Sequence, residues 1–205
     1  MNKFKKIYLN LCKKIYSVGR LEFDEYQISK NYQNATVQEK TIFYTGSTIY
    51  NPSNDKSKIK IGVNCHIYGS LNVLPYGGCI SFGDNCSLGD HSRIVSVKGI
   101  YIGDRVMIAH NVNILDNNSH PRDAKMRHDD FINNYSGGTK TYDLEGKEII
   151  IEDDVSIGFN STILKGVTIG KGSIIAPGSM VVRNVPPNSI VFGHPAKVVW
   201  KIKQA

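Results

Sequence analysis

The chain of 205 residues is long enough for one substantial domain, and it carries 25 Lys and Arg against 18 Asp and Glu, a net charge of +7. Six of the basic residues and no acidic residue lie in residues 1–20, so the remaining body is almost neutral. This distribution, without a nucleic-acid-binding motif, argues against a DNA- or RNA-binding body. No apolar run approaches the roughly 18 residues of a membrane span, and the N-terminus lacks a secretory signal pattern, so we expect a cytoplasmic protein.

Residues 4–18 predict an amphipathic helix. Apolar side chains recur there at alternating spacings of four and three residues, which places them on one stripe with the lysines opposite: Phe4, Tyr8, Leu11, Ile15 and Val18. One interpretation is a basic helix that makes peripheral contact with an anionic membrane surface through residues 1–20, at the inner face of the membrane. The alternative, which we favour, is a helix that covers an exposed end of the fold or packs on a neighbouring subunit.

Residues 20–58 are weakly patterned, with a β-leaning stretch at residues 41–44 and a turn at residues 51–54. We therefore expect residues 1–58 to contain the helix and an irregular first coil. Residues 59–200 are expected to form the main domain, and residues 201–205 a short tail.

A six-residue repeat runs through the last third of the chain. Aliphatic residues recur every six positions, and a small or β-branched residue follows each by four positions; the aliphatic set is Ile151, Ile157, Ile163, Ile169, Ile175 and Val181. Neither a helix, with a period of about 3.6 residues, nor a simple strand, with a period of about two, produces this spacing. A solenoid with one hexapeptide on each flat face does. The repeat therefore predicts an all-β fold, a parallel β-helix with triangular coils of about 18 residues.

The starts of successive coils indicate where the solenoid is interrupted. Similar local sequences surround Ile61, Phe82, Ile102, Ile151 and Ile169, and the intervals between these residues are 21, 20, 49 and 18. The interval of 49 residues contains a polar loop, from about residue 116 to residue 147, that leaves the regular stack. Long loops in compact domains are usually functional or disordered, so this loop is the first place to look for chemistry.

Two of the four cysteines are predicted to stack in the core. Cys65 and Cys86 occupy the small inward position of their repeats and are 21 residues apart, the same interval as their coils. Because the chain has no Cys-x-x-Cys pair, we expect reduced core residues rather than a disulfide framework or a metal site.

The C-terminal half resembles a known family. The segments that carry the resemblance are Ile163–Gly170, Gly178-Ser179, Val185-Pro186-Pro187 and Gly193–Lys197, together with Asn-Ser-His-Pro at residues 118–121. They are similar to hexapeptide-repeat acetyltransferases, above all to galactoside and maltose acetyltransferases and bacterial polysaccharide O-acetyltransferases, over about residues 59–200. The resemblance implies a left-handed β-helix, a homotrimer, and transfer of acetyl from acetyl-CoA, without a metal, to a hydroxyl of a sugar in a bacterial surface glycan.

In that family a His-Pro pair at the start of the loop supplies the catalytic base, and here the pair is His120-Pro121. A sugar hydroxyl is a poor nucleophile and must lose its proton as it attacks the thioester. An imidazole suits that task at neutral pH. Direct transfer then needs only base, hydroxyl and thioester held in line.

The resemblance also implies a cofactor groove between two adjacent chains. It places the contacting positions on Lys165, Pro177, Val182, Arg183 and Lys197. Arg183 and Lys197 would bind the CoA phosphates through charge-assisted hydrogen bonds. Pro177 and Val182 would offer backbone groups to the pantetheine amides.

The chain departs from the family at three positions. Ser156 stands where relatives often have a tryptophan beside the groove, and Trp200 stands at an often basic position. Gly89 replaces an asparagine near the acetyl group. Three polar residues beside Gly89 are candidates for acceptor binding: Asp90, His91 and Arg93. Asp116, four residues before His120, is a further candidate and would orient the imidazole.

Three alternatives stay open. Amino-sugar N-acetyltransferases share the fold and the groove, although the loop-borne His120-Pro121 favours the O-acetyl branch. A catalytically silent β-helix scaffold is disfavoured by the same pair and by the CoA-type tail. A zinc enzyme of related fold needs at least three protein ligands. His91 and His110 are 19 residues apart, close to the length of one coil, and a stacked pair would supply only two.

Overall fold

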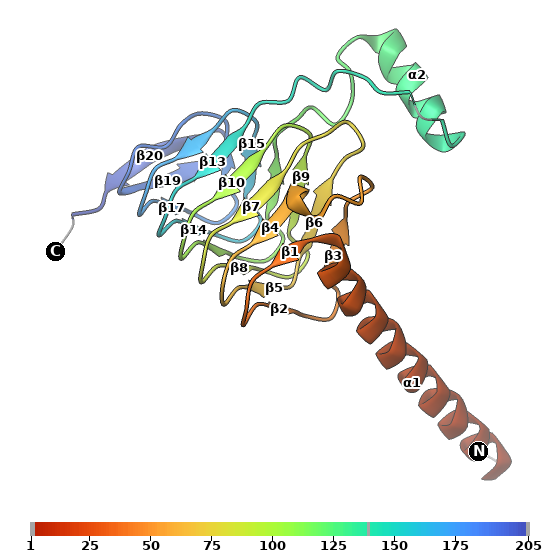
Figure 1. The fold of residues 1–205 in the computed structure, drawn as a ribbon. Coiled ribbons are helices and arrows are strands. Elements are labelled where there is room, and N and C mark those ends of the chain that lie inside the picture. Colours follow the sequence, from red (N-terminus) through yellow and green to blue (C-terminus); the bar gives the residue numbers. More distant parts are fainter. Residues whose placement is uncertain (1–2, 139, 204–205) are drawn as a thin grey trace.

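The computed structural model describes residues 3–138 and 140–203, with side chains from residue 10 on, and in these residues three sheets form the sides of a prism (Figure 1). Sheet A contains β1 (Thr36–Val37), β4 (Ile59–Ile61), β7 (Ile80–Phe82), β10 (Ile100–Ile102), β13 (Ile149–Ile151) and β16 (Thr168–Ile169). Sheet B contains β2 (Ile42–Phe43), β5 (His66–Ile67), β8 (Ser87–Leu88), β11 (Met107–Ile108), β14 (Ser156–Ile157), β17 (Ile174–Ile175), β19 (Ser189–Gly193) and β20 (Ala196–Lys201). Sheet C contains β3 (Thr48–Tyr50), β6 (Ser70–Val73), β9 (Arg93–Ser96), β12 (Asn113–Leu115), β15 (Thr162–Leu164) and β18 (Met180–Val181).

Each coil contributes one strand to each sheet, and neighbouring strands are parallel except for the last pair, β19 and β20. The coil starts predicted from the sequence lie opposite one another in sheet A, in the order Ile61, Phe82, Ile102, Ile151 and Ile169. Their side chains are buried inside the prism, as are the aliphatic residues of the hexapeptide repeat. The predicted parallel β-helix is therefore confirmed.

A ladder of aspartates explains the Gly-Asp sequences at the corner between sheets A and B. The Val63 N–H donates to Asp84 Oδ1 at 2.7 Å, the Asp84 N–H to Asp104 Oδ1 at 2.8 Å, and the Asp104 N–H to Asp153 Oδ1 at 3.0 Å. Each carboxylate thus holds the turn of the preceding coil. A Cβ atom on Gly83 would overlap the Asp104 carboxylate, so glycine is required there.

The two predicted core thiols stack as expected. Cys65 and Cys86 are buried and free, and each Sγ donates to a backbone carbonyl of the next coil, at 3.2 Å and 3.1 Å. The hydrogen bond with Cys65 and burial together raise the pKa of the Cys86 thiol. A buried, protonated Cys86 behaves as a small core residue.

The N-terminal region differs from the prediction in two ways. Helix α1 (Lys3–Asn34) continues well past residue 18, because residues 19–34 contain no proline and only one glycine, Gly19. The first coil is regular rather than irregular, since β1, β2 and β3 pair in register with β4, β5 and β6. A single 3₁₀ turn, η1 (Lys56–Lys58), leads into the second coil.

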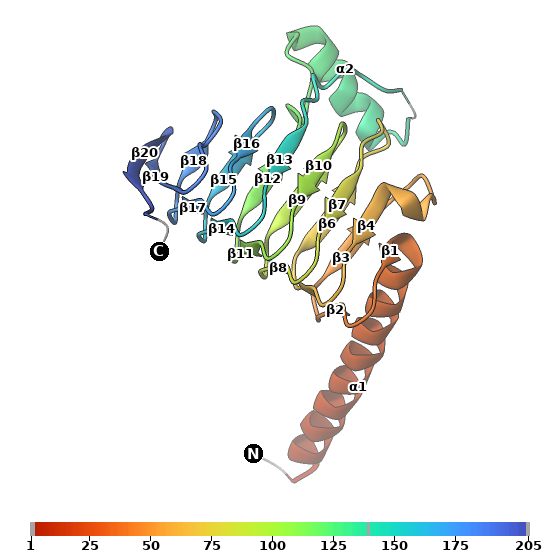
Figure 2. The same ribbon diagram turned by 60° about the vertical axis from the view of Figure 1, so that its left-hand side comes forward.

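The last turns of α1 cover the open edge of the first coil. Buried Asn31 donates through Nδ2 to the Ser47 carbonyl at 3.0 Å and accepts the Ile49 N–H through Oδ1 at 2.9 Å. The Tyr32 ring meets the Phe43 ring edge-on, with centroids 4.8 Å apart. The predicted covering of this end thus comes from the last turns of α1 and not from its apolar stripe. The described members of the stripe, Leu11, Ile15 and Val18, are exposed, and the helix projects away from the coils (Figure 2).

A 33-residue segment, 116–148, separates β12 from β13 and contains helix α2 (Ala124–Tyr135) outside the prism (Figure 1). Its two arms meet at the base, where the Lys147 N–H donates to the Asp116 carbonyl at 2.8 Å and the Asn118 N–H to the Leu144 carbonyl at 3.0 Å. The coils on either side stay in register. The loop therefore attaches to the fold without disturbing it.

The sequence analysis did not predict α2, although the helix has a recognisable start. The Asp123 carboxylate accepts the Met126 N–H at 2.9 Å and caps the first turn.

We expect Asn31→Ala to lower the free energy of unfolding by about 1–3 kcal/mol, because the Ile49 N–H loses its buried acceptor. Urea unfolding followed by circular dichroism measures the change. Asn10→Ala, on the exposed part of the same helix, is the matched control and should shift stability by less than about 0.5 kcal/mol. Equal effects of the two substitutions would contradict the capping role of Asn31.

Candidate active site

Asp116 fixes the point at which the loop leaves the prism. Its carboxylate is buried and accepts three successive backbone N–H groups, those of residues 97–99, at 2.9, 2.9 and 2.8 Å, and the Ser96 hydroxyl at 2.7 Å. These donors belong to the turn of the preceding coil. The predictions that Asp116 orients His120 or contacts a substrate are therefore wrong, because its oxygens are already used inside the fold.

His120 follows a tight turn at the start of the loop. The Ser119 N–H donates to Asn117 Oδ1 at 2.8 Å, and the His120 N–H donates to the Asn118 carbonyl at 2.7 Å. Ser119 has φ +64°, which reverses the chain direction there. This turn directs the His120 side chain, which is 52% exposed, outward from the corner between sheets C and A.

An aspartate from α2 holds the His120 ring. His120 Nδ1 lies 2.7 Å from Asp130 Oδ2, and the Asp130 side chain is only 1% exposed. An ionised carboxylate can only accept, so Nδ1 carries the proton and donates it, which leaves the lone pair on Nε2. A fixed imidazole with a free acceptor nitrogen is the arrangement of a general base.

Two further side chains hold Asp130. The Tyr76 hydroxyl and Asn134 Nδ2 both donate to Asp130 Oδ1, at 3.3 Å and 3.2 Å. Burial, and then the charge and hydrogen bond of Asp130, raise the pKa of Tyr76, so its hydroxyl stays protonated and donates at neutral pH. Tyr76 comes from the short corner insertion that lengthens the interval from Ile61 to Phe82 to 21 residues.

Sequence reasoning missed Asp130 and Tyr76. A helix start at Asp123 would have placed Asp130 and Asn134 on one face of α2, four residues apart. No local signal pairs Tyr76 with residues more than forty positions away.

Four predicted site residues lie at the same corner between sheets C and A. Besides His120, the strand register places Lys165 one coil beyond Asp116 and Arg183 one coil beyond Lys165, with Val182 beside it. Arg183 is exposed, and Val182 is 38% exposed. Lys197 is exposed on β20, in sheet B. In the described part of the chain, neither Arg183 nor Lys197 forms an ion pair with a carboxylate, so both are available to an anion.

Lys165 is already engaged with the loop. Its side chain is 15% exposed, and Nζ donates to the Glu145 carbonyl at 2.8 Å and lies 3.4 Å from Glu145 Oε2. The same carboxylate oxygen lies 3.2 Å from Arg122 Nε. Lys165 therefore ties the returning arm of the loop to the prism, whatever else it contacts.

The three acceptor candidates lie at a different corner, between sheets B and C. Asp90, His91 and Arg93 line a hollow of about 240 Å³ together with Tyr68. Asp90 Oδ2 lies 3.4 Å from His91 Nε2, and the Arg93 guanidinium donates twice to Asn113 Oδ1, at 3.1 and 2.8 Å. The hollow is open to solvent.

His91 and His110 do not stack on adjacent coils, because the register places His110 opposite Asp90. The His110 ring stacks on Phe159, with centroids 5.2 Å apart, and the register places Pro177 on the next coil of this column. His91, with φ +57°, occupies the left-handed turn position that Asn111 takes one coil further on. In the described ranges, no group of three His, Cys, Asp or Glu residues is placed to hold a metal ion.

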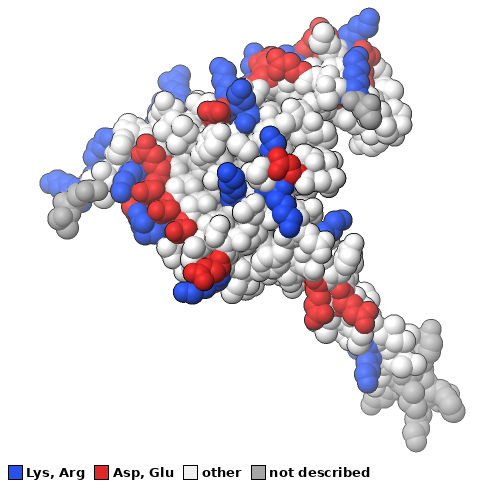
Figure 3. Space-filling model, in the orientation of Figure 1, with Lys and Arg blue, Asp and Glu red and all other residues white. Residues whose placement is uncertain are grey.

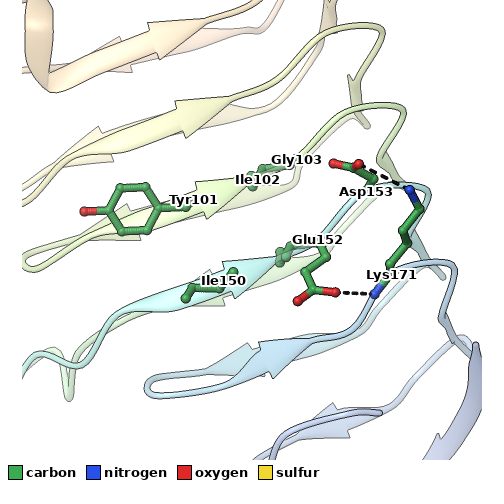
Figure 4. Close-up of a pocket in the computed structure, with 8 residues that line it drawn as sticks. Tyr101, Ile102, Gly103, Ile150, Glu152, Asp153 and Lys171 are labelled. Atoms are coloured by element: carbon green, nitrogen blue, oxygen red, sulfur yellow. Dashed lines mark hydrogen bonds and ion pairs between the residues drawn. The ribbon is translucent and has the colours of Figure 1, made fainter. Parts of the chain in front are cut away.

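Of two other hollows, one lies away from the pair of His120 and Asp130, and the other adjoins Tyr76, which holds Asp130. The first, of about 350 Å³, lies on sheet A and is lined by Tyr101 and Ile150 among others (Figure 4). At its edge, Lys171 Nζ lies 3.6 Å from Asp153 Oδ2, and the Lys171 N–H donates to the Glu152 carboxylate. None of the predicted site residues lines it. A second, of about 280 Å³, lies between the loop and the coils and is lined by Tyr76, Val97, Lys98, Tyr142, Asp143, Leu144 and Gly146.

The predicted site residues are thus divided between two corners of one chain. His120, Lys165, Val182 and Arg183 lie at the corner between C and A, whereas Pro177 and the acceptor candidates lie between B and C. At Gly89, a Cβ atom would lie 2.6 Å from the Ala109 carbonyl oxygen, which explains why asparagine is absent there.

Comparisons with known proteins agree with the fold and the repeat. The chain matches the family model for the bacterial transferase hexapeptide (six repeats) over residues 148–183 and that for the hexapeptide repeat of succinyl-transferase over residues 80–115. A protein of Escherichia coli K12, named as a lipopolysaccharide biosynthesis O-acetyl transferase, is 32% identical over 149 residues, 72% of this chain and 74% of that protein. The chain therefore belongs to the hexapeptide-repeat acetyltransferase family, which confirms the resemblance.

Other relatives differ in the group that they acylate. Galactoside O-acetyltransferase of Lactococcus lactis is 31% identical over 146 residues, 71% of this chain and 64% of that enzyme. A solved N-acyltransferase from Bacillus cereus, in complex with dTDP-4-amino-4,6-dideoxyglucose and coenzyme A, superposes with a TM-score of 0.67 at 19% identity, over 85% of this chain and 87% of that one. At that identity the likeness shows the fold alone. The chain spans 57% to 74% of the length of the first curated relatives that it matches.

We expect Asp130→Asn to lower kcat for acetyl transfer on the order of 10²-fold or more, because the amide no longer fixes the Nδ1–H tautomer of His120. The KM for acetyl-CoA should change by less than about threefold, since the substitution leaves cofactor binding alone. Steady-state kinetics across a pH series measures both. Asn134→Ala, which removes only a second donor to Asp130, is the control and should cost less than about tenfold. A fall in acetyl-CoA affinity with unchanged kcat would contradict the positioning role of Asp130.

Proposed function

We propose that the protein is an acetyl-CoA-dependent O-acetyltransferase that acetylates a hydroxyl of a sugar, in a bacterial capsule, lipopolysaccharide or other surface glycan. The observation that carries this proposal is the pair of His120 Nδ1 and Asp130 Oδ2 at 2.7 Å, with the ring partly exposed at the start of the loop. The two relatives described above, at 32% and 31% identity, are named as O-acetyltransferases. We place the reaction in the cytoplasm, because acetyl-CoA is an intracellular metabolite.

The reaction needs one base and no covalent intermediate. His120 Nε2 accepts the proton of the acceptor hydroxyl as its oxygen attacks the thioester carbonyl carbon. The C–O bond forms, the C–S bond breaks, and the proton passes from Nε2 to the departing CoA thiolate. Asp130 stabilises the imidazolium that exists between these two proton transfers.

Acetyl-CoA fits the exposed cations of the chain. Arg183 and Lys197 offer charge-assisted hydrogen bonds to its phosphates, because neither is ion-paired within the described residues. Lys165 would contact the cofactor while its Nζ stays hydrogen-bonded to the Glu145 carbonyl. Pro177 and Val182 are exposed beside turns whose backbone groups can meet the pantetheine amides.

The proposed assembly is a homotrimer of left-handed β-helices. The division of site residues between two corners supports it, because a ring of three chains brings the corner between C and A of one copy against the corner between B and C of the next. In this arrangement the loop of residues 116–148 covers the neighbouring groove, and the hollow beneath it, next to Tyr76, lies near the acceptor.

Transfer to an amino sugar is the second candidate, because the Bacillus cereus neighbour is an N-acyltransferase bound to an amino sugar nucleotide. The two activities give different products, an ester or an amide. Incubation with acetyl-CoA and matched panels of sugars and amino sugars, followed by treatment of the product with hydroxylamine, separates them. An ester releases its acetyl group under this treatment, whereas an amide retains it and would favour the N-acetyl reaction.

His120→Ala should lower turnover on the order of 10²–10⁴-fold, the usual contribution of a positioned general base. Release of CoA thiol measures turnover, and equilibrium binding of acetyl-CoA should change little. His91→Ala and His110→Ala are the controls. A larger loss in either control would show that the base has been misassigned, and full activity in His120→Ala would favour a non-catalytic scaffold.

The trimer predicts a mass near three times 22.8 kDa in sedimentation equilibrium at micromolar concentration. Mixing His120→Ala with a variant altered at the other corner, Arg93→Ala, tests the shared site. Each variant has one altered corner, so a mixed trimer contains some interfaces at which both corners are intact. These interfaces should restore part of the activity. A stable monomer that turns over normally would contradict the proposal.

A further inference from the structure

The outer half of α1 presents apolar side chains that are largely exposed. Leu11, Ile15 and Val18 are 55%, 64% and 47% exposed, and they form one stripe on the helix. This stripe lines a shallow apolar hollow with Lys14 and Gly19, and Glu22 borders the hollow at its end nearer the body. Such a surface on a helix that projects from the fold indicates a partner.

The charges of α1 change sign along its length. Residues 3–20 contain six basic residues and no acidic one, whereas residues 21–34 contain Glu22, Asp24 and Glu25 against Lys30. Figure 3 shows acidic side chains where α1 leaves the body and basic side chains further out. Lys13 and Arg20 lie about half a turn from Leu11, opposite the stripe. The outer half of the helix is thus basic and amphipathic, and the part beside the body is acidic.

The position of the acidic residues argues against a coiled coil with other copies of the chain. The alternation of four and three that relates Leu11, Ile15 and Val18 continues to Glu22 and Glu25. In a trimeric coiled coil these positions would place like carboxylates together in the core. A flat anionic surface brings no such carboxylates together. It contacts only the outer half of α1, and the acidic turns stay beside the body.

We propose that residues 3–21 of α1 bind the surface of an anionic lipid bilayer. The stripe of Leu11, Ile15 and Val18 enters the boundary between headgroups and acyl chains, and the lysines contact lipid phosphates. Residues 3–20 are about 27 Å long at helical rise, so the helix lies along the interface. No helix of the described residues is long and apolar enough to cross a membrane. The inference goes beyond acetyl transfer and does not rest on it.

Co-sedimentation of the full chain with lipid vesicles tests the inference. The probes are vesicles of phosphatidylcholine alone and vesicles in which about one third of the lipid is phosphatidylglycerol. Binding is expected to the anionic vesicles only, and it should weaken when the salt concentration rises from about 0.1 to about 0.5 M.

Two substitutions at equally exposed positions separate the stripe from the rest of the helix. Ile15 and Phe23 are both 64% exposed, but Phe23 lies between Glu22 and Asp24. Ile15→Gln should weaken binding to anionic vesicles about tenfold or more, whereas Phe23→Gln should change it by less than about twofold. Both variants should keep the circular dichroism spectrum of the parent and its transfer activity on a soluble acceptor.

Equal binding to both kinds of vesicle, or equal effects of the two substitutions, would overturn the inference. A chain that binds neither kind of vesicle would also overturn it. If Ile15→Gln then lowers the mass of the assembly in sedimentation, the stripe joins copies of the chain instead. Vesicle binding requires neither acetyl-CoA nor an acceptor. A failure here is therefore distinguishable from a failure of the proposed acetyl transfer.

Discussion

The structure depends on the register between stacked coils. Every inward aliphatic residue meets its counterpart one coil away, and this alignment is kept across the interval of 49 residues from Ile102 to Ile151. The prism is too narrow for a displaced side chain, so a shift of one residue would turn the aliphatic set outward. The chain can therefore expel a long segment only at a corner. Asp116 makes this possible, because its buried carboxylate holds the turn of the previous coil while the backbone departs.

The candidate site follows from that departure. His120 stands four residues beyond the anchored corner, and α2 returns Asp130 to its ring, while Tyr76 from another coil fixes Asp130 in turn. The His120 imidazole is thus supported by both the rigid prism and the loop. The ties from Glu145 to Lys165 and Arg122 hold the loop's returning arm in place. A half-exposed imidazole on a mobile loop would lose this orientation, and with it most of the advantage of a positioned base.

The repeat allowed the coils, their starts and the stacked thiols Cys65 and Cys86 to be predicted, because a narrow prism translates inward positions directly into sequence spacing. The regular first coil was missed although Val37, Phe43 and Ile49 recur every six residues. Three repeats beside a long segment without the pattern give a weaker signal than the six at the C-terminal end. Asp116 was assigned the wrong role, because proximity in sequence to His120 does not reveal that its oxygens are consumed by residues 96–99. Asp130 and Tyr76 meet only in three dimensions, and no spacing rule relates them.

The structure of the two ends of the prism limits the end-to-end association of molecules into fibres. A stack of parallel coils leaves unpaired backbone N–H and C=O groups at both ends, where the strands of a second molecule could pair with them. At the first coil, Asn31 occupies the Ser47 carbonyl and the Ile49 N–H, at and just before β3, which such a molecule would use. At the last, β20 turns back antiparallel to β19 and reverses the pattern that an incoming parallel strand would need in sheet B. One amide side chain and one reversed strand therefore oppose end-to-end stacking of molecules, the first at the start of the prism and the second at the end of sheet B.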